Sequence, residues 1–420
     1  MLQSRVPRIV ATLVAFVLLV AQAACGGERM VPAPVRSPQS PTPLPLPSGP
    51  LPPPEKLSPP GTAGPLKVAL LVPLSGANAG LGKAMLEAAQ LALFATASER
   101  LTLVPRDTAG TAEGAASAAR SALSEGARLI IGPLLAAEVE AVKPVARDAN
   151  VNVIAFSTAT QLAGGNLFLI GFLPRQEVVR EVSYAHEQGL GRFAALVPNT
   201  QYGHLMSDAL REAASASGAA VVKVEQINAG GSDAASAIRR LLAGGGAPAA
   251  AGVPPAPPAG KPEFDALLLP EGGAQLKALA HQLREAGLDT TQVRLLGSGL
   301  WDDPSIAGEP ALDGGWFAAS PPETRREFES RFSATYGHPA PRLAALAFDA
   351  AALAAALAKG NPEPFSREAI LNPNGFTGVD GLFRFTPQGL VQRGLAVLEV
   401  EAGGSKVVSP APTSFQDLAY

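Results

Sequence analysis

The sequence predicts an α/β fold with two lobes, each a mainly parallel sheet with helices on both faces. Three observations lead to this prediction. From Leu66 onward, short apolar strands alternate with alanine-rich helical segments. The strands lack polar alternation, which is typical of strands buried on both faces of a parallel sheet. The alternation starts again after Phe172, so we expect two successive units of similar size.

The first unit opens with the apolar strand LKVALLVPL, followed by a segment that places Leu86, Ala89 and Leu93 on one helical face. The same pattern of apolar run and alanine-rich segment then repeats. Strands are expected at 66–74, 101–107, 127–133 and 151–157, and helices at 82–98, 114–126 and 136–149.

The second unit shows the same order of elements. Its runs RFAALVPN and FDALLLP are buried-strand patterns, and each is followed by an amphipathic segment. Helices are expected at 177–189, 205–218, 234–244 and 272–287, and strands at 192–199, 220–227, 264–270 and 293–299. Ligands are expected at the carboxyl ends of such strands.

Two segments of biased composition interrupt this pattern. Residues 31–65 are rich in proline, which fixes φ and removes a hydrogen-bond donor, so we expect an extended spacer of roughly 100 Å or simple disorder. Residues 243–262 combine glycine, alanine and proline between a helix and a strand. We interpret them as a low-complexity loop without chemistry of its own.

The N-terminus has the pattern of a secretory signal: Arg5 and Arg8, an apolar run, then small residues before Cys25. The run is shorter than the roughly 20 residues that span a bilayer, so a membrane anchor is the weaker alternative. Cys25 is the chain's single cysteine. It is either an incidental residue of an ordinary signal peptide or, as we favour, a lipidated one.

Composition and motifs argue against several functional classes. A net charge of −3 without long basic runs gives no footprint for nucleic acid. The segment GANAGLGKA lacks the spacing and the Ser/Thr of a phosphate-binding loop, and LGSGL lacks the spacing of a hydrolase nucleophile elbow. The four histidines are scattered, without metal-ligand spacing. We expect no enzyme, no cofactor and no metal.

Several motifs carry a resemblance to a known family. LKVALLVPLSGANAGLGKAMLEAAQLAL, ARLIIGPLLAAEVEAVKPVARDANVNVIAFSTAT, NTQYGHLMSDALRE and NPNGFTGVDGLFRFTPQGLVQRGLAVLEV stand in the order typical of type I periplasmic binding proteins of the Leu/Ile/Val-binding class. The resemblance covers roughly 67–410. It implies a Venus flytrap, in which two lobes joined by three crossings close on a ligand.

The resemblance also implies the boundaries of the domains. The crossings are expected near 171–175, 316–321 and 375–380. The resulting division is a signal peptide at 1–24, the lipidated Cys25 with its linker at 25–65, lobe 1 at 66–172 plus 320–375, and lobe 2 at 173–319 plus 376–412.

Relatives that bind amino acids hold the ligand carboxylate with hydroxyls and backbone N–H groups in the first lobe. The matching residues here are Ser75, Gly76, Ser157, Thr158 and Thr160. The alternative, equally open, is that these hydroxyls cap helices.

The second lobe supplies the other matching positions. Tyr202 matches an aromatic residue that closes over ligand, with ordinary packing as the alternative. Gly299 stands where relatives carry the acid that neutralises a ligand ammonium, and the nearby Asp302 and Asp303 are interpreted as the end of a loop. A zwitterion buried without a counter-charge is unfavourable by several kcal/mol, so free amino acids are not favoured as ligands.

The segments LGSGLWDDP, GPLL and GGWFAASP resemble the branch of penicillin-binding-protein activator lipoproteins. The segment Ala23-Ala24-Cys25-Gly26 resembles a bacterial lipobox, in which the cysteine is lipidated. In such lipoproteins an aspartate directly after the cysteine is the signal for retention in the inner membrane, so the resemblance, with Gly26 at this position, implies delivery to the outer membrane. The leading hypothesis is therefore a lipid-anchored periplasmic protein that activates a peptidoglycan synthase by contact. The alternative is the solute-binding component of an ABC transporter for amino acids or similar small polar ligands. A ligand-gated sensor is a third, weaker reading.

Overall fold

The computed structural model describes residues 65–96, 100–243, 262–359 and 362–416. The signal peptide 1–24, Cys25 with the proline tract up to residue 64, and most of the low-complexity loop, 244–261, lie outside the described residues.

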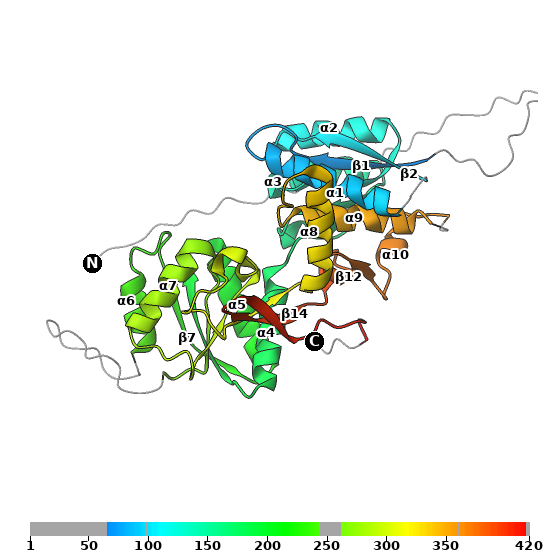
Figure 1. The fold of residues 1–420 in the computed structure, drawn as a ribbon. Helices are drawn as coiled ribbons and strands as arrows, with labels where there is room; N and C mark the ends of the chain where they lie inside the picture. The colour runs from blue at the N-terminus through cyan, green and yellow to red at the C-terminus, as the bar shows by residue number, and fades with distance from the viewer. Residues whose placement is uncertain (1–64, 97–99, 244–261, 360–361, 417–420) are drawn as a thin grey trace, which may run out of the picture. The chain divides into compact units, whose positions relative to one another are not determined.

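The first sheet is parallel throughout, with the strand order β2-β1-β3-β4-β5 (Figure 1). Its strands are β1 (Leu66–Val72), β2 (Leu101–Asp107), β3 (Ala127–Ile131), β4 (Asn152–Ala155) and β5 (Leu167–Leu169). Helices α1 (Ala79–Thr96), α2 (Ala112–Ser124) and α3 (Ala136–Asp148) connect them, with a 3₁₀ turn η1 (Thr160–Leu162). Helices α8 (Pro322–Tyr336), α9 (Ala344–Leu357) and α10 (Arg367–Ile370) join this lobe from later in the chain.

The central strand β1 shows why the sheet needs helices on both faces. Val68 and Leu70 belong to a core formed with α1 and α9, whereas Ala69 and Leu71 belong to a core formed with α2 and α3. Successive side chains of a strand point to opposite faces, so a run of apolar residues supplies both cores. All four side chains are fully buried, and burial of one leucine contributes about 1.5–3 kcal/mol.

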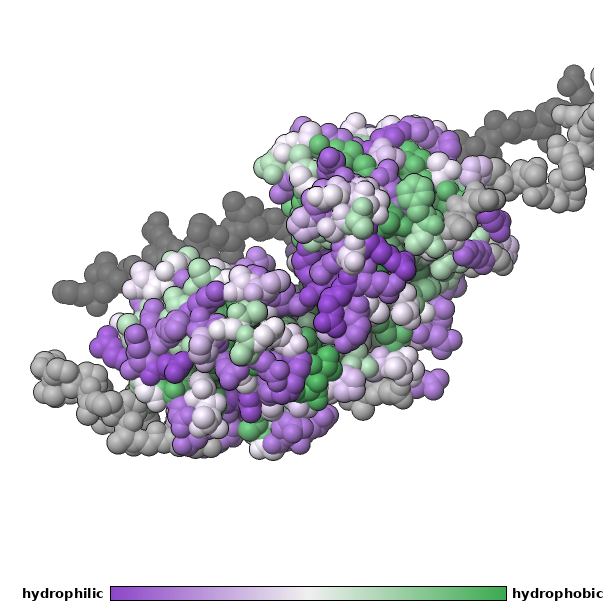
Figure 2. Space-filling model, viewed as in Figure 1, coloured by the Kyte–Doolittle hydropathy of each residue, from purple (hydrophilic) through white to green (hydrophobic). Residues whose placement is uncertain are grey.

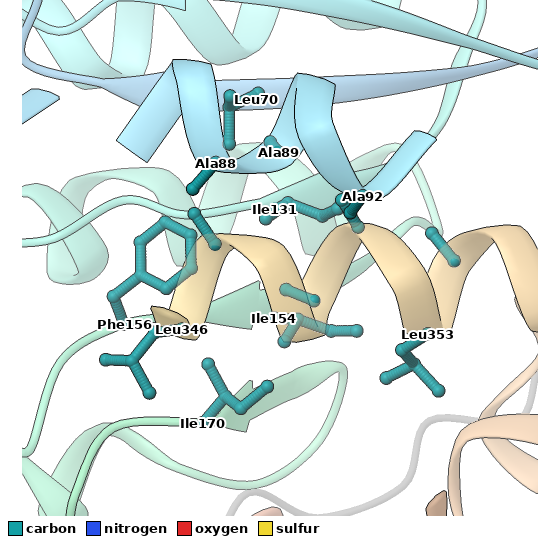
Figure 3. Packing of buried hydrophobic residues seen from close by; sticks show 14 of the residues in the cluster. Leu70, Ala88, Ala89, Ala92, Ile131, Ile154, Phe156, Ile170, Leu346 and Leu353 are labelled. Atoms are coloured by element: carbon teal, nitrogen blue, oxygen red, sulfur yellow. The ribbon is translucent and has the colours of Figure 1, made fainter. Parts of the chain in front are cut away.

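Helices α1 and α9 pack through small side chains. Figure 3 shows Ala88, Ala89 and Ala92 of α1 pointing towards α9, whereas Leu346 and Leu353 lie on the side of α9 that faces away from α1. Alanine leaves the two backbones room to approach. Apart from the buried Asp349, helix α9 is apolar on all sides, which is typical of a buried helix.

Helix α8 has the opposite composition. It buries Phe328 and Phe332 in the first core, while its remaining surface is rich in arginine and glutamate. Figure 2 shows this surface as a hydrophilic area. Gly337, with φ of 77°, ends the helix, because this left-handed conformation suits a residue without a side chain.

The second sheet has the order β15-β14-β10-β9-β8-β6-β7, in which β14 runs antiparallel to both of its neighbours, β10 and β15, and the other pairs are parallel. Its strands are β6 (Arg192–Pro198), β7 (Ala220–Ile227), β8 (Ala266–Leu268), β9 (Arg294–Leu296), β10 (Trp316–Ala319), β14 (Ala396–Glu401) and β15 (Gly404–Ser409). Its helices are α4 (Pro174–Glu187), α5 (Gln201–Ala216), α6 (Ala234–Leu242) and α7 (Gly273–Glu285), with 3₁₀ turns η2 (Gly299–Trp301) and η3 (Pro304–Ile306).

The second lobe repeats the arrangement of the first. Along β6, Ala194 and Leu196 pack on the side of α6 and α7, whereas Phe193 and Val197 pack on the side of α4 and α5. The predicted fold class, two α/β units with helices on both faces of mainly parallel sheets, is confirmed.

Both lobes also share a close approach between their first strand and the helix that follows. A Cβ at Gly82 in α1 would lie 1.9 Å from the carbonyl oxygen of Pro73. A Cβ at Gly203 in α5 would lie 1.9 Å from that of Pro198. Only glycine allows either helix to pack this tightly on the end of its strand.

A small antiparallel sheet differs from the expected division of the chain. It consists of β11 (Phe376–Gly378), β12 (Gly381–Phe385) and β13 (Val391–Arg393). The sequence places 376 onward in lobe 2, but Phe383, Phe385 and Val391 are buried in the core of the first lobe. Packing therefore moves the third crossing from 375–380 to the region around Gly394, ahead of β14.

Candidate functional site

A cavity of about 710 Å³ lies at the carboxyl ends of the strands and is lined from both lobes. Its lining residues are Asn78, Leu81, Leu134, Leu135, Ala136, Phe156, Ser157, Thr158, Ala159, Thr160, Gln161, Phe172 and Leu343 from the first lobe, and Pro174, Gln201, Tyr202 and Leu205 from the second. We call this cavity the cleft. Its volume suits a small organic ligand.

Apolar side chains dominate the cleft, and none of the described residues that line it carries a charge. Leucine, phenylalanine and alanine make up eight of the thirteen described residues that line the first-lobe wall, and Leu205 on the second-lobe wall is 37% exposed. The polar groups are hydroxyls and side-chain amides. The cleft therefore favours a ligand with an apolar body and a few hydrogen-bonding groups.

A second hollow, of about 990 Å³, lies at the opposite edge of the first sheet, where β3 and β4 begin. Its lining includes Ala127, Asn152 and Arg367. Ligands of open α/β sheets bind at the carboxyl ends of strands, so we take the cleft as the candidate site.

Three of the hydroxyl residues named from the sequence line the cleft together. Ser157 lies two residues after the end of β4 and is 6% exposed, and its Oγ accepts a hydrogen bond of 3.2 Å from the N–H of Ala159. Thr158 and Thr160 are exposed on the same turn. The hydroxyl of Ser157 thus stabilises the turn that presents the two threonines.

Ser75 and Gly76 are not among the residues that line the cleft. The N–H groups of Leu74 and Ser75 donate to Oδ1 of Asp107, at 2.8 and 3.2 Å, and Ala109 donates to the same oxygen at 2.7 Å. Desolvation works against ionisation of Asp107, but the hydrogen bonds from these residues outweigh it and hold its pKa below the usual range. The carboxylate of Asp107 therefore occupies the anion site expected at Ser75.

At the start of helix α3, which borders the cleft, a carboxylate of the chain also accepts a backbone N–H. Leu135, which lines the cleft, donates its N–H to Oε2 of Glu138 at 2.9 Å. Glu138 is fully buried, and its Oε1 has no hydrogen-bond partner among the described residues. A carboxylate of the chain thus lies where a ligand anion would approach this helix.

Tyr202 lines the cleft from the first turn of α5, a helix capped by the hydroxyl of Thr200. Its hydroxyl donates a hydrogen bond of 3.1 Å to Oγ of Ser298, a fully buried residue just after β9. Burial raises the pKa of Tyr202, and the charges of Glu177, Glu181 and Glu271 raise it further. Tyr202 is therefore neutral and fixed against the second-lobe wall.

Position 299 is a glycine, but in the structure the carboxylate of Glu177, from helix α4, lies beside it. Oε2 of Glu177, in the first turn of α4, accepts a hydrogen bond of 2.8 Å from the N–H of Gly299. A Cβ at Gly299 would lie 2.5 Å from Oε1 of the same carboxylate. Gly299 thus leaves the space that Glu177 fills.

Burial raises the pKa of Glu177 to about 7, against the opposing effects of the Gly299 N–H and the charge of Arg342. One turn further along α4, Glu181 is 1% exposed and accepts a hydrogen bond of 2.8 Å from the N–H of Ala318. Sequence reasoning missed both acids. The signal was present: they stand four residues apart, each followed by a buried valine.

A partly buried ion cluster joins the lobes. Asp302 of the second lobe pairs with Arg325 of the first, at 2.7 Å between Oδ1 and Nη2. Arg342 pairs with Asp380 at 2.8 Å and lies 3.8 Å from the ring centre of Phe172 in the cleft. Asp302, interpreted from the sequence as the end of a loop, thus also holds an arginine of the other lobe.

Two features are absent from the described ranges. No group of three or more His, Cys, Asp and Glu side chains in this part of the chain is arranged to hold a metal ion. None of the helices described there is both long enough and apolar enough to cross a membrane.

Comparisons with solved structures show the same fold. A branched-chain amino acid ABC transporter periplasmic ligand-binding protein from Burkholderia xenovorans LB400 has a TM-score of 0.66 and 20% identity, covering 82% of this chain and 94% of its own. A solute-binding protein from Rhodopseudomonas palustris BisB5, in complex with 3,4-dihydroxybenzoic acid, has a TM-score of 0.58 and 19% identity, covering 82% and 96%. The substrate-binding protein LivJ from Streptococcus pneumoniae, in complex with isoleucine, has a TM-score of 0.57 and 20% identity, covering 83% and 100%.

No curated protein sequence gives a significant match to this chain. A family model described as periplasmic binding protein matches residues 65–405. This match includes both lobes and every residue that lines the cleft. The chain therefore belongs to the periplasmic binding protein family, which implies a periplasmic location.

Proposed function

We propose that this protein is the solute-binding component of an ABC transporter and holds a small ligand with an apolar body in the cleft. The observation that carries the proposal is the cavity of about 710 Å³ lined from both lobes. Structures of similar fold hold isoleucine or 3,4-dihydroxybenzoic acid, both small molecules that combine an apolar body with polar groups. We therefore favour solute binding for an ABC transporter over activation of a peptidoglycan synthase.

A thermal-shift screen tests this function. The compounds are leucine, isoleucine, phenylalanine, phenethylamine and 4-hydroxybenzoate, with glutamate and sucrose as controls that lack an apolar body. A ligand at 100 times its Kd stabilises the folded state by about 2.7 kcal/mol. We expect at least one apolar compound to raise Tm by a few degrees, with flat responses to both controls. Flat responses throughout would contradict the proposal.

Contact with a peptidoglycan synthase remains a second candidate function. It is favoured by the lipobox-like end of the signal sequence at Cys25 and the proline tract behind it, which would tether the binding domain at a distance from a membrane. Cross-linking in membranes followed by pull-down separates the two functions. We expect enrichment of a permease subunit, whereas enrichment of a transpeptidase or glycosyltransferase would favour the second candidate.

We also propose that Cys25 carries a lipid, with outer-membrane delivery favoured by Gly26. Two acyl chains hold a protein firmly where one chain is marginal. Mass spectrometry of the mature N-terminus should show an acylated cysteine, and Cys25→Ala should release the protein from the membrane fraction. An unmodified mature N-terminus beyond residue 25 would contradict lipidation.

A further inference from the structure

We propose that a second small-ligand site lies beside the crossings between the lobes and takes a small carboxylate with an aliphatic body, held by Arg180. The site is a cavity of about 480 Å³ lined from both lobes, which we call the hinge cavity. None of the described residues lines both the hinge cavity and the cleft. The proposal goes beyond solute binding in the cleft and does not depend on which ligand the cleft holds.

The hinge cavity lies beside two of the crossings between the lobes. The second lobe lines it with α4 and the end of α5, and the first lobe with residues between Thr386 and Arg393. Gln176 follows the first crossing, and Arg393 precedes the third. Oε1 of Gln176 accepts a hydrogen bond of 3.0 Å from the N–H of Arg393, so the two lobes are joined at this wall.

The environment of Arg180 points to an anion. This residue is 8% exposed and lines the hinge cavity from α4. Its Nε donates to the carbonyl of Leu395 at 3.0 Å and its Nη2 donates to Oγ of Ser409 at 2.5 Å, and both acceptors are uncharged. In the described part of the chain, no acidic side chain forms an ion pair with Arg180. A buried cation without a counter-charge is unfavourable, and an anionic ligand would supply that charge.

The guanidinium of Arg180 also keeps one nitrogen for a ligand. None of the described residues accepts a hydrogen bond from its Nη1, and this atom is not enclosed by protein atoms. Nε and Nη1 of Arg393, by contrast, lack a hydrogen-bond partner and are enclosed. Nη1 of Arg180 is therefore a donor that a molecule in the hinge cavity can reach.

The other charges that line the hinge cavity are already paired. Glu212, the one acid among the described lining residues, forms a two-point ion pair with Arg175, with 2.9 Å between Nε and Oε2. Nη1 of Arg393 lies 4.0 Å from Oδ2 of Asp349 in the first lobe. Arg180 thus remains as the lining cation without a carboxylate.

The acid that follows Arg180 in the sequence does not neutralise it. Oε1 of Glu181 accepts the N–H of Ala318, on β10, at 2.8 Å. Burial, together with the charge of Glu177, raises the pKa of Glu181 well above its ordinary value although this hydrogen bond opposes the shift. Glu181 therefore offers Arg180 little negative charge near neutral pH.

Aliphatic side chains determine the body of the ligand. Val179 of α4, Ala213 and Ala216 of α5, and Leu390 and Val391 of the first lobe all line the hinge cavity. None of the described lining residues is aromatic. This wall suits a short aliphatic chain whose carboxylate accepts a charge-assisted hydrogen bond from Arg180. Such a ligand contacts both lobes and should stabilise their present arrangement.

Three probes with the same aliphatic chain test the charge. Hexanoate carries a carboxylate, hexanamide a neutral amide and hexylamine an ammonium. In calorimetric titrations near neutral pH we expect hexanoate to bind with a Kd about tenfold or more below that of hexanamide, as a charge-assisted hydrogen bond provides, and hexylamine to bind more weakly still. No binding of hexanoate, or a Kd for hexanamide or hexylamine that is equal or lower, would overturn the proposal.

A pair of arginine variants tests the role of Arg180. Arg180→Gln removes the cation but keeps a side chain that can donate hydrogen bonds, and we expect it to raise the Kd of hexanoate about tenfold. The matched control is Arg211→Gln, which removes an exposed arginine of α5 that does not line the hinge cavity and should leave the Kd unchanged. An unchanged Kd in the folded Arg180→Gln variant would overturn the proposal.

A pair of tryptophan variants tests the position without altering Arg180. Ala216 is exposed at the end of α5 and lines the hinge cavity, so Ala216→Trp should fill part of it and raise the Kd of hexanoate at least about tenfold. Ser215→Trp adds the same indole at an exposed position that does not line the cavity, and should leave the Kd unchanged. Equal effects of the two tryptophans would contradict binding in the hinge cavity.

Thr160→Trp separates this site from the cleft. Thr160 lines the cleft and not the hinge cavity, so we expect hexanoate to bind this variant as it binds the original protein. Loss of hexanoate binding in Thr160→Trp, with no change in Ala216→Trp, would place the carboxylate in the cleft. That result would overturn the proposal of a second site and leave the proposed function of the cleft intact.

Discussion

Arg393→Met is expected to lower the free energy of unfolding by about 3–5 kcal/mol, as found when one partner of a buried ion pair is removed. Arg393 is 3% exposed and donates to the carbonyl of Ile170 at 2.7 Å. Its Nη1 lies 4.0 Å from Oδ2 of the buried Asp349. Without this arginine, Asp349 and the buried Asp380 remain close together with much less positive charge. Urea denaturation followed by circular dichroism measures the loss.

The pH dependence of that loss separates charge from packing. Burial, together with the charge of Asp380, raises the pKa of Asp349 to about 7 although Arg393 opposes the shift. A raised pKa means that stability contributed by the protonated carboxyl is present at low pH and is lost as pH rises through about 7. The deficit of Arg393→Met should therefore be larger at pH 8 than near pH 5.5. A deficit that does not change with pH would show that lost packing, rather than the uncompensated carboxylates, is the cause.

Arg384→Met on the neighbouring strand β12 is the control for this variant. Its guanidinium is half-buried and bonds to Gln392 and to the carbonyl of Pro373, without a buried carboxylate beside it. We expect a loss of about 1 kcal/mol or less. Equal losses of unfolding free energy in Arg393→Met and Arg384→Met would contradict a special role for the buried charges of Arg393, Asp349 and Asp380.

Gly203→Ala is expected to cost about 3 kcal/mol, at the upper end of typical overpacking penalties. The added Cβ would lie 1.9 Å from the carbonyl oxygen of Pro198, so the first turn of α5 must move away from β6. Tyr202 moves with it, and we expect its hydrogen bond to Ser298 to weaken. The effect should therefore appear both in the urea midpoint and in ligand affinity.

Gly191→Ala provides the matched control in the same lobe. No atom lies within 4 Å of a Cβ at Gly191, and its φ is not in the left-handed region. We expect its stability to stay within about 0.5 kcal/mol of the original, since the substitution only restricts the unfolded chain. A comparable loss in both variants would indicate that the contact with Pro198 is not the cause of the Gly203→Ala effect.

Apolar runs and helical periodicity were sufficient to predict the two lobes. Strands such as LKVALLVPL are buried on both faces, and their side chains do pack alternately into two cores. The position of β11–β13 was not predictable in this way. Membership of a lobe depends on where Phe383 and Phe385 pack, and alternating apolar residues fit either core.

The position of some candidate residues was predictable because neighbouring residues share a strand end. Ser157, Thr158 and Thr160 lie in the turn after β4 and line the cleft together with Tyr202. Asp107 and Glu177 were missed because each acts on a residue distant in the sequence: Asp107 on Ser75, and Glu177 on Gly299 across 122 positions. Such contacts arise from tertiary packing, which a single sequence does not contain.

Calorimetric titration of the original protein and of Thr160→Trp tests the central claim that the cleft binds the ligand. The titrant is the compound that gives the largest thermal shift. Thr160 is exposed on the cleft wall, so an indole there should fill part of the cavity without changing the Tm of the ligand-free protein. We expect one-to-one binding in the original protein and a Kd at least about tenfold higher in Thr160→Trp. An unchanged Kd in a folded Thr160→Trp would place the ligand outside the cleft and contradict the claim.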